Sequence, residues 1–327
     1  MKKTLNQKND WRKDLSSNEI ERLDKLHINN PFMHLKVLIL VGIWLLSAWV
    51  ATHFTFLPLK ILCWTIIGFC IHGMAIFAHE GAHGSLTKIY WLDRIIGFFC
   101  GLPGCFPCNN YRATHLLHHE FENTSKDPDN LDANIKHPIL RSLVFYIWAF
   151  VGMPIYILVL IVTGPIRAKI WYDRLICLFE PLLMTGIYIK LFQYALLHHE
   201  MDLLINGWLM ALPFTVIIAN IRGLAEHTQI FHETPVNHLK STRTTLTNGW
   251  ISFFFNNQNY HLEHHLFPHV PWYNLPKVYE VLKNHYEKKQ ATICKSYTDY
   301  MLGVLRYGPL KPLTYKNMTH YLDKDHL

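Results

Sequence analysis

Histidine is the residue whose spacing in this sequence points most directly to chemistry. Eight histidines fall in three clusters, and within each cluster the later ones follow the first by three or four positions, so that a helix presents their imidazoles on one face. Two imidazoles four positions apart on a helix can share one metal ion. The clusters are His79 and His83 in HEGAH, His115, His118 and His119 in HLLHH, and His261, His264 and His265 in HLEHH.

Three such clusters in one chain predict a metal centre. A single histidine on an apolar helix face is usually a hydrogen-bonded core residue, but three clusters at ligand spacing are hard to obtain by chance. A closed structural zinc site uses four ligands, so eight or more histidines predict two metal ions. Imidazole binds iron, copper, zinc and nickel, and the spacing does not choose among them.

The order and context of the motifs indicate a family. HEGAH, HLLHH and NYHLEHHLFPHVPWYNLP follow one another with hydrophobic segments between them. From about residue 71 to residue 281 the sequence resembles the membrane fatty acid desaturase and hydroxylase superfamily. The resemblance implies two histidine-ligated iron ions that use dioxygen as co-substrate. It also implies a ninth ligand, His227, because family members carry a further ligating histidine just after the last membrane crossing.

Five carboxylates are candidates to orient the ligating imidazoles by accepting a hydrogen bond from the second ring nitrogen. Two of them follow the second cluster, where the alternative is that they cap a surface loop. The other three lie beside histidines, at spacings that do not make them ligands. The five are Asp127 and Asp129 after the second cluster, and Glu80, Glu226 and Glu263.

The composition is that of a membrane protein with sizeable polar parts. Of the 327 residues 50% are hydrophobic and 17% are charged, below the quarter that is typical of soluble domains. The net charge of +7 is typical of basic cytoplasmic loops. No basic run with interleaved aromatic residues predicts nucleic-acid binding, and the seven cysteines, without regular disulfide spacing, are interpreted as free thiols.

The apolar segments predict an all-α integral membrane protein of about four transmembrane helices, with a cytoplasmic helical cap that carries the histidine-ligated two-metal site. A fifth apolar segment, residues 139–162, is interrupted by Gly152-Met153-Pro154. If it also crossed, the third cluster would lie on the opposite side from the other two, so we expect it to be re-entrant or interfacial. The expected crossings lie near residues 35–57, 59–78, 176–197 and 203–221.

This topology divides the chain into three parts. Residues 1–34 form a cytoplasmic N-terminal segment, 35–281 a desaturase-like membrane domain, and 282–327 a cytoplasmic tail. In a bacterium the membrane would be the inner one. Within the first segment, Ser16 to Glu19 before an amphipathic stretch predicts a capped helix, which lies either on the membrane surface or against the domain.

The function expected from these residues is oxidation of a lipid. A lipid chain that enters between apolar helices fits the composition, and the resemblance favours dioxygen-dependent desaturation of a long-chain fatty acyl group. The alternative is a hydroxylase or ketolase of the same superfamily that acts on a carotenoid, an alkane or another lipophilic compound. A histidine-rich metal transporter is a more distant alternative, because it would place ligands near mid-bilayer, whereas these clusters lie at or beyond helix ends.

Two kinds of partner are expected. The sequence has no HPGG haem signature and no flavin or dinucleotide fingerprint, so reductant is expected from a separate ferredoxin, rubredoxin or small cytochrome at the basic cytoplasmic face. The substrate is expected to be a membrane lipid or acyl compound. Lys240 and Arg243, just before the third cluster, are candidates to contact an anionic head group, with a solvated surface as the alternative.

Overall fold

The computed structural model describes residues 10–130, 135, 137–228 and 237–311, and within them the regular secondary structure is helical apart from two strands of two residues each. The segments expected at residues 1–34 and 282–327 lie partly outside the described residues. Five segments are long and apolar enough to cross a membrane, which supports the expected membrane protein; the count of four crossings stays a prediction. Three of them are single helices: α4 (Leu57–His83), α7 (Pro138–Arg167) and α8 (Trp171–Leu197). The segment Pro31–His53 consists of η2 (Pro31–Leu35) and α3 (Lys36–His53). The segment Met201–His227 consists of α9 (Met201–Gly207), η5 (Leu209–Ala211) and α10 (Leu212–His227).

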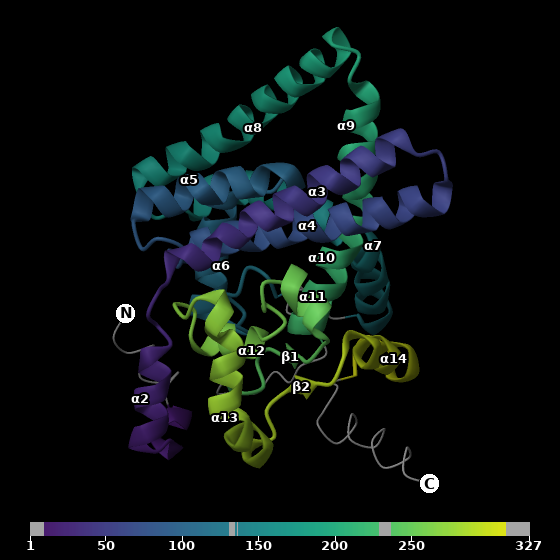
Figure 1. Cartoon of the computed structure of the whole chain (residues 1–327). Coiled ribbons are helices and arrows are strands. Elements are labelled where there is room, and N and C mark those ends of the chain that lie inside the picture. The colour runs from purple at the N-terminus through teal and green to yellow at the C-terminus, as the bar shows by residue number, and fades with distance from the viewer. Residues whose placement is uncertain (1–9, 131–134, 136, 229–236, 312–327) are drawn as a thin grey trace.

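Helix α4 is the central element of this group. In its most apolar stretch 67% of the residues are buried inside the protein, against 11% to 39% in the other four segments. Its neighbours are α3, which lies antiparallel beside it, α10, and the short helices α5 (Tyr90–Gly101) and α6 (Cys108–Phe121) (Figure 1). The other long helices keep much of their apolar surface exposed, as helices in contact with lipid do.

Two glycines explain how α4 ends at the first histidine cluster. A Cβ atom on Gly81 would stand 2.6 Å from the carbonyl oxygen of Asp93, so α5 can approach α4 this closely only because residue 81 has no side chain. Gly84 takes the left-handed conformation, with a φ of 71°, in which a glycine commonly terminates a helix. His83 is therefore the last helical residue, and the cluster lies at the end of the long helix as expected.

Helix α7 continues through Gly152-Met153-Pro154 as one helix of 30 residues, with a local defect in its hydrogen bonding. In a regular helix the Met153 N–H would donate to the Ala149 carbonyl. Here Asn220 of α10 bridges that pair: its Oδ1 accepts from the Met153 N–H at 2.8 Å, and its Nδ2 donates to the Ala149 carbonyl at 3.3 Å. The interruption expected at Gly152–Pro154 is thus a bridged defect, and the re-entrant or interfacial position of this segment stays a prediction.

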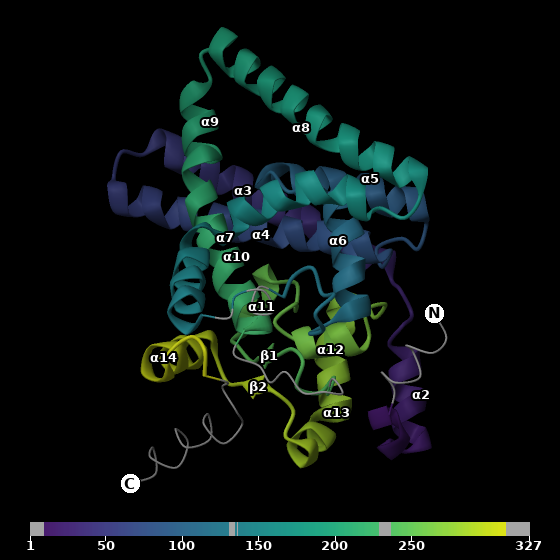
Figure 2. The same ribbon diagram turned by 180° about the vertical axis from the view of Figure 1, so that it is seen from behind.

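The remaining elements gather on one side of the long helices, while the junction of α8 and α9 lies at the far end in both views (Figures 1 and 2). Strands β1 and β2 pair in parallel, Thr244 with Ile293 and Thr245 with Cys294. Helix α14 packs against the first half of α7 through Tyr300 and Val304. The elements on this side are β1 (Thr244–Thr245), α11 (Gly249–Phe254), α12 (His261–Leu266), η6 (Trp272–Asn274), α13 (Leu275–Lys289), β2 (Ile293–Cys294) and α14 (Tyr297–Tyr307). The short η3 (Leu102–Gly104) follows α5 and packs against α4.

The N-terminal segment contains η1 (Asp10–Asp14) and the expected capped helix α2 (Ser17–Lys25). The capping box is present: Ser16 accepts from the Glu19 backbone N–H at 3.3 Å, and the Glu19 carboxylate accepts from the Ser16 backbone N–H at 2.7 Å. Helix α2 packs against α13, so it lies against the domain.

We predict that Asn220→Leu lowers the free energy of unfolding by about 1–3 kcal/mol, because it leaves the half-buried N–H of Met153 in α7 without its side-chain acceptor. Denaturant titration of the protein in detergent micelles would measure the change. Asn206→Ala is the control, since the Asn206 amide donates only to the Asp202 carbonyl one turn earlier in α9. An equal loss in both variants would contradict the bridging role of Asn220.

Candidate metal centre

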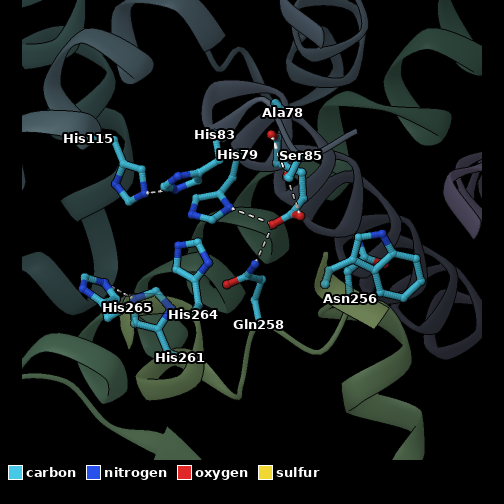
Figure 3. A network of polar contacts seen from close by, with 12 residues as sticks. Ala78, His79, His83, Ser85, His115, Asn256, Gln258, His261, His264 and His265 are labelled. Atoms are coloured by element: carbon cyan, nitrogen blue, oxygen red, sulfur yellow. Dashed lines mark hydrogen bonds and ion pairs between the residues drawn. The ribbon is translucent and has the colours of Figure 1, made fainter. Parts of the chain in front are cut away.

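The nine histidines expected to bind metal come together where four helices meet. Figure 3 shows rings from α4, α6 and α12 arranged around one region. Eight of the nine are buried and the ninth, His227, is half-buried. Their positions are His79 and His83 in the last turns of α4, His115, His118 and His119 on α6, His227 at the end of α10, and His261, His264 and His265 on α12.

The first group takes one ring nitrogen from each of five histidines, and all five nitrogens lie within 4.8 Å of one another. The Nε2 atom of His115 is 2.9 Å from that of His83 and 3.0 Å from that of His119. The Nε2 atoms of His119 and His264 are 3.2 Å apart. Together with His79, these residues make a pocket of five imidazoles from α4, α6 and α12.

The second group adjoins the first and contains the other four histidines. The nitrogens of His118, His227 and His265 lie within 4.8 Å of one another, as do those of His227 and His261 with the Glu226 carboxylate. The Nε2 atom of His261 is 2.8 Å from that of His227 and 3.1 Å from that of His265. His227, which no spacing motif marks, is therefore placed among the clustered histidines.

This arrangement fits metal ions. A neutral imidazole carries one proton on two nitrogens, so facing nitrogens that share several neighbours cannot all be satisfied by one another. The Nδ1 atom of His118 lies 2.8 Å from an Asp127 oxygen, which leaves its Nε2 lone pair toward the centre; among the described residues that Nε2 has no hydrogen-bond partner. Two adjoining groups of ring nitrogens, from eight buried histidines and the half-buried His227, could hold metal.

A family assignment follows from the sequence. The sequence model of the family named Fatty acid desaturase matches residues 55–297, a range that contains all nine histidines. The chain belongs to the fatty acid desaturase family. The resemblance drawn from the three motifs is thereby confirmed.

Three similar proteins of this desaturase family show its range. A sphingolipid delta(4)-desaturase of Xenopus tropicalis is 30% identical over 264 residues, which cover 75% of each chain. An sn-1 oleoyl-lipid 12-desaturase of a Picosynechococcus species is 22% identical over 280 residues, 77% of this chain and 76% of that one. A beta-carotene ketolase of a Paracoccus species is 27% identical over 249 residues, 72% of this chain and 83% of that one.

Three of the five expected carboxylates of this desaturase-family chain do lie against a clustered histidine. Asp127 contacts His118 at 2.8 Å and also accepts from the backbone N–H groups of Asn123 and Asp129, both at 2.9 Å, so that it orients an imidazole and closes a loop at once. A Glu226 oxygen lies 3.5 Å from Nδ1 of His261, and the carboxylate accepts from Arg222 at 2.7 and 2.8 Å.

Glu80 links the first cluster to the chain before the third. One of its oxygens lies 3.5 Å from Nδ1 of His79 and accepts from the Gln258 amide at 2.9 Å, while the other accepts from the Ser85 hydroxyl at 2.8 Å. Asn256, two residues before Gln258, donates to the Gly73 carbonyl of α4 at 2.8 Å. These contacts fix α12 against α4.

The other two carboxylates contact no histidine among the described residues. Both oxygens of Asp129 accept from the Tyr156 hydroxyl, at 3.2 and 3.1 Å, while its backbone N–H supports Asp127. Glu263 accepts from the hydroxyl of Thr244 in β1. The two residues support the loop and the third cluster instead of orienting a ring.

Glu122 is a contact that the sequence did not identify. Its Oε1 atom lies 2.8 Å from Nδ1 of His265 and accepts from the Ser241 hydroxyl at 2.9 Å, and its Oε2 lies 3.5 Å from Nδ1 of His238. The sequence did contain an indication of this role, because Glu122 follows His119 by three positions. A helix turn brings such a residue to the same side, but the nearby pair of aspartates has the more conspicuous pattern.

Burial and charge set the protonation of the centre. Burial lowers the pKa of His115, His119, His261 and His264 well below the usual range and so favours their neutral, metal-binding form. Burial acts in the same direction on His118, but the Asp127 carboxylate outweighs it and raises the pKa of His118 to about 9. His118 is therefore a stronger base than these four rings, as an imidazole supported by a carboxylate is expected to be.

Of the two residues expected to contact a lipid head group, Arg243 is buried and Lys240 is half-buried. The Arg243 side chain is fully buried, its guanidinium donates to the Ala225 carbonyl, and it lies over the ring of Tyr300 at 5.3 Å. This position does not support a head-group contact for Arg243, because its charge is already committed inside the protein. Lys240 is half-buried, and its contact with a head group stays a prediction.

We predict that Glu122→Gln lowers metal affinity by roughly 10- to 100-fold, the usual effect of removing the acceptor behind a ligating histidine. The neutral amide holds the His265 N–H less strongly than a carboxylate does. Competition for iron(II) with a chelator would measure the affinity. Glu120→Gln serves as control and should leave the affinity unchanged, because Glu120 is an exposed residue of α6 whose carboxylate pairs with Lys169, between α7 and α8. Equal affinities of wild type and Glu122→Gln would refute the assignment.

Proposed function

We propose that the protein catalyses dioxygen-dependent desaturation of a long-chain fatty acyl group, with two iron ions held by its nine histidines. The observation that carries the proposal is the pair of adjoining groups of buried, facing imidazole nitrogens in a chain of the desaturase family. The first ion would be held by His79, His83, His115, His119 and His264, and the second by His118, His227, His261 and His265.

The residues of the chain prepare this centre. Bound iron ions would supply the activation of dioxygen that removes two hydrogens from an unactivated carbon chain, with reduction of dioxygen to water. Asp127 and Glu122 lie 2.8 Å from the outer nitrogens of His118 and His265 and so orient these two rings, while Glu226 lies 3.5 Å from that of His261. Burial of the rings excludes water, and the apolar surfaces of the long helices provide access for a lipid chain from within the membrane.

A second candidate is ketolation or hydroxylation of a lipophilic compound. The 27% identity with a beta-carotene ketolase over 72% of this chain favours it, because the same set of histidines serves both kinds of oxidation. Metal transport has less support. His83 and His227 are the last residues of α4 and α10, so the nitrogen donors gather at helix ends and not at mid-helix positions along a transmembrane path.

The proposal includes a separate electron donor and a defined topology. A ferredoxin, rubredoxin or small cytochrome would dock at the basic cytoplasmic face, in keeping with the net charge of +7. The termini and the group α11 to α14 would lie on the cytoplasmic side, and the exposed residues between α8 and α9 on the other.

The lipid profile of a host that expresses the chain tests the function. We expect new unsaturated fatty acyl species in the wild-type host, because the proposed centre oxidises an acyl chain, and none with His264→Ala. Mass spectrometry of extracted lipids and pigments would measure both. New keto or hydroxy pigments with an unchanged acyl profile would support the second candidate and exclude desaturation.

His227 allows a direct test of the assignment of nine ligands. His227→Ala should remove iron and activity as His264→Ala does, because its Nε2 faces His261 at 2.8 Å. His238→Ala is the matched control: its ring faces Glu122 and not the centre, so most of the iron should stay. Iron analysis of the purified variants decides. Full occupancy in His227→Ala, with activity reduced only ~10- to 100-fold, would exclude His227 as a ligand. His232, a second control by position, lies outside the described residues.

A further inference from the structure

Helix α6 carries three of the nine histidines, yet its own N-terminal residue does not cap it. The residue before the helix is Pro107, which makes no side-chain cap. The first N–H groups of a helix have no partner within the helix. Here Cys108, Asn109 and Asn110 are buried, out of reach of water. Because a buried N–H without an acceptor is strongly destabilising, another element must accept from this end of α6.

That acceptor is Glu180, from the middle of α8. One carboxylate oxygen accepts from the backbone N–H groups of Asn109 at 2.8 Å and Asn110 at 3.2 Å, and the other accepts from the Asn109 side-chain amide at 3.0 Å. Glu180 is only 4% exposed, although it lies in one of the five apolar segments. A buried carboxylate in such a segment is expensive unless it has a role.

The electrostatics of this contact favour a carboxylate over a neutral group. The N-terminus of a helix carries partial positive charge, which stabilises a nearby anion. Charge-assisted hydrogen bonds are also about twice as strong as neutral ones. From the other side Arg94 of α5 donates to the Asn109 amide oxygen and to Asp173 of α8, so Asn109 lies between a guanidinium and a carboxylate.

The next residue, Asn110, fixes the same end of α6 to a third helix. Its amide donates to the Leu160 carbonyl of α7 at 3.3 Å and to the Cys177 carbonyl of α8 at 3.0 Å. Gly164 of α7 packs directly on it, since a Cβ atom there would come within 2.7 Å of the amide nitrogen. The start of α6 is therefore in close contact with both α7 and α8.

We propose that Glu180 is a positioning residue of the metal centre that acts as the N-cap of α6 from a different helix. His115, His118 and His119 lie ~8 to 14 Å further along the helix axis than Asn110. A helix behaves as a rigid rod over this length. The position of Asn110 along the helix axis, and its rotation about that axis, therefore fix the positions of all three rings. Those rings belong to both groups of nitrogens, and the inference therefore rests on the proposed metal assignment.

The test combines a local and a metal-based measurement on the full-length protein. In Glu180→Ala, hydrogen exchange of the Asn109 and Asn110 amides should rise roughly 2- to 30-fold, the factor for loss of a cap. The ligand-field spectrum of the cobalt(II)-loaded protein should change as well, because α6 no longer holds its rings in place. Glu180→Gln, which keeps the volume and one acceptor oxygen, should lie between wild type and Glu180→Ala. Glu120→Ala on the exposed face of α6 is the control and should change neither measurement.

A second-site rescue separates capping from general packing. Pro107 has the extended conformation of an N-cap residue, with φ −77° and ψ 99°. In the double variant Pro107→Asp/Glu180→Ala, an aspartate at the N-cap accepts from the same N–H groups. We expect slow amide exchange and the wild-type cobalt spectrum to return.

The outcomes are distinct. Unchanged exchange and spectrum in Glu180→Ala, or a folded double variant without rescue, would overturn the positioning role while the proposed function stands. A wild-type protein that binds neither cobalt(II) nor iron(II) would overturn the proposed function, and this inference with it. If Glu180→Ala does not fold, Glu180→Gln and the double variant still decide.

Discussion

The rest of this structure depends on holding imidazole nitrogens close to one another in a buried space. Nitrogens 2.8 to 3.2 Å apart repel one another unless a proton or a cation lies between them. Burial keeps most of these rings neutral but does not determine how each ring is oriented. Direction comes from acceptors on the outer nitrogens, such as Asp127 and Glu122, and from helix ends that are fixed in place.

The helix ends are fixed by polar contacts that are unusual for apolar helices. The Gly84 terminus stops α4 at His83, Glu180 anchors the start of α6, and Asn220 joins α10 to α7. Each contact satisfies backbone groups that would otherwise be orphaned in a medium without water. The buried polar residues of this protein thus stabilise the long helices and position the centre at the same time.

The sequence predicted the part of the centre that has helical periodicity. Eight histidines were evident because three- and four-residue spacing on a helix is visible without a structure. His227 had no such pattern. Glu122 follows His119 by three positions, but this spacing does not show that it contacts His265, because that contact depends on how α6 packs against α12. The same reason explains Asp129 and Arg243: their charges suggested contact with a ring or a head group, but Tyr156 and the Ala225 carbonyl engage them. The defect in α7 was evident from Gly152-Met153-Pro154, whereas its bridging by a residue 66 positions later was not.

The bridge at Asn220 has a mechanical consequence. Asn220 and His227 are seven residues, or about two turns, apart on α10 and so lie on one side of the same helix. The contact with the middle of α7 and the position of the ninth histidine are consequently both set by α10. Helix α7 has only 11% of its most apolar stretch buried, so it is the long helix most open to the surrounding lipid. If a change in bilayer thickness tilted α7, the contact through Asn220 would move α10 and with it the ring of His227. The lipid composition of the membrane would then affect the geometry of the second group of nitrogens, and not only the supply of substrate.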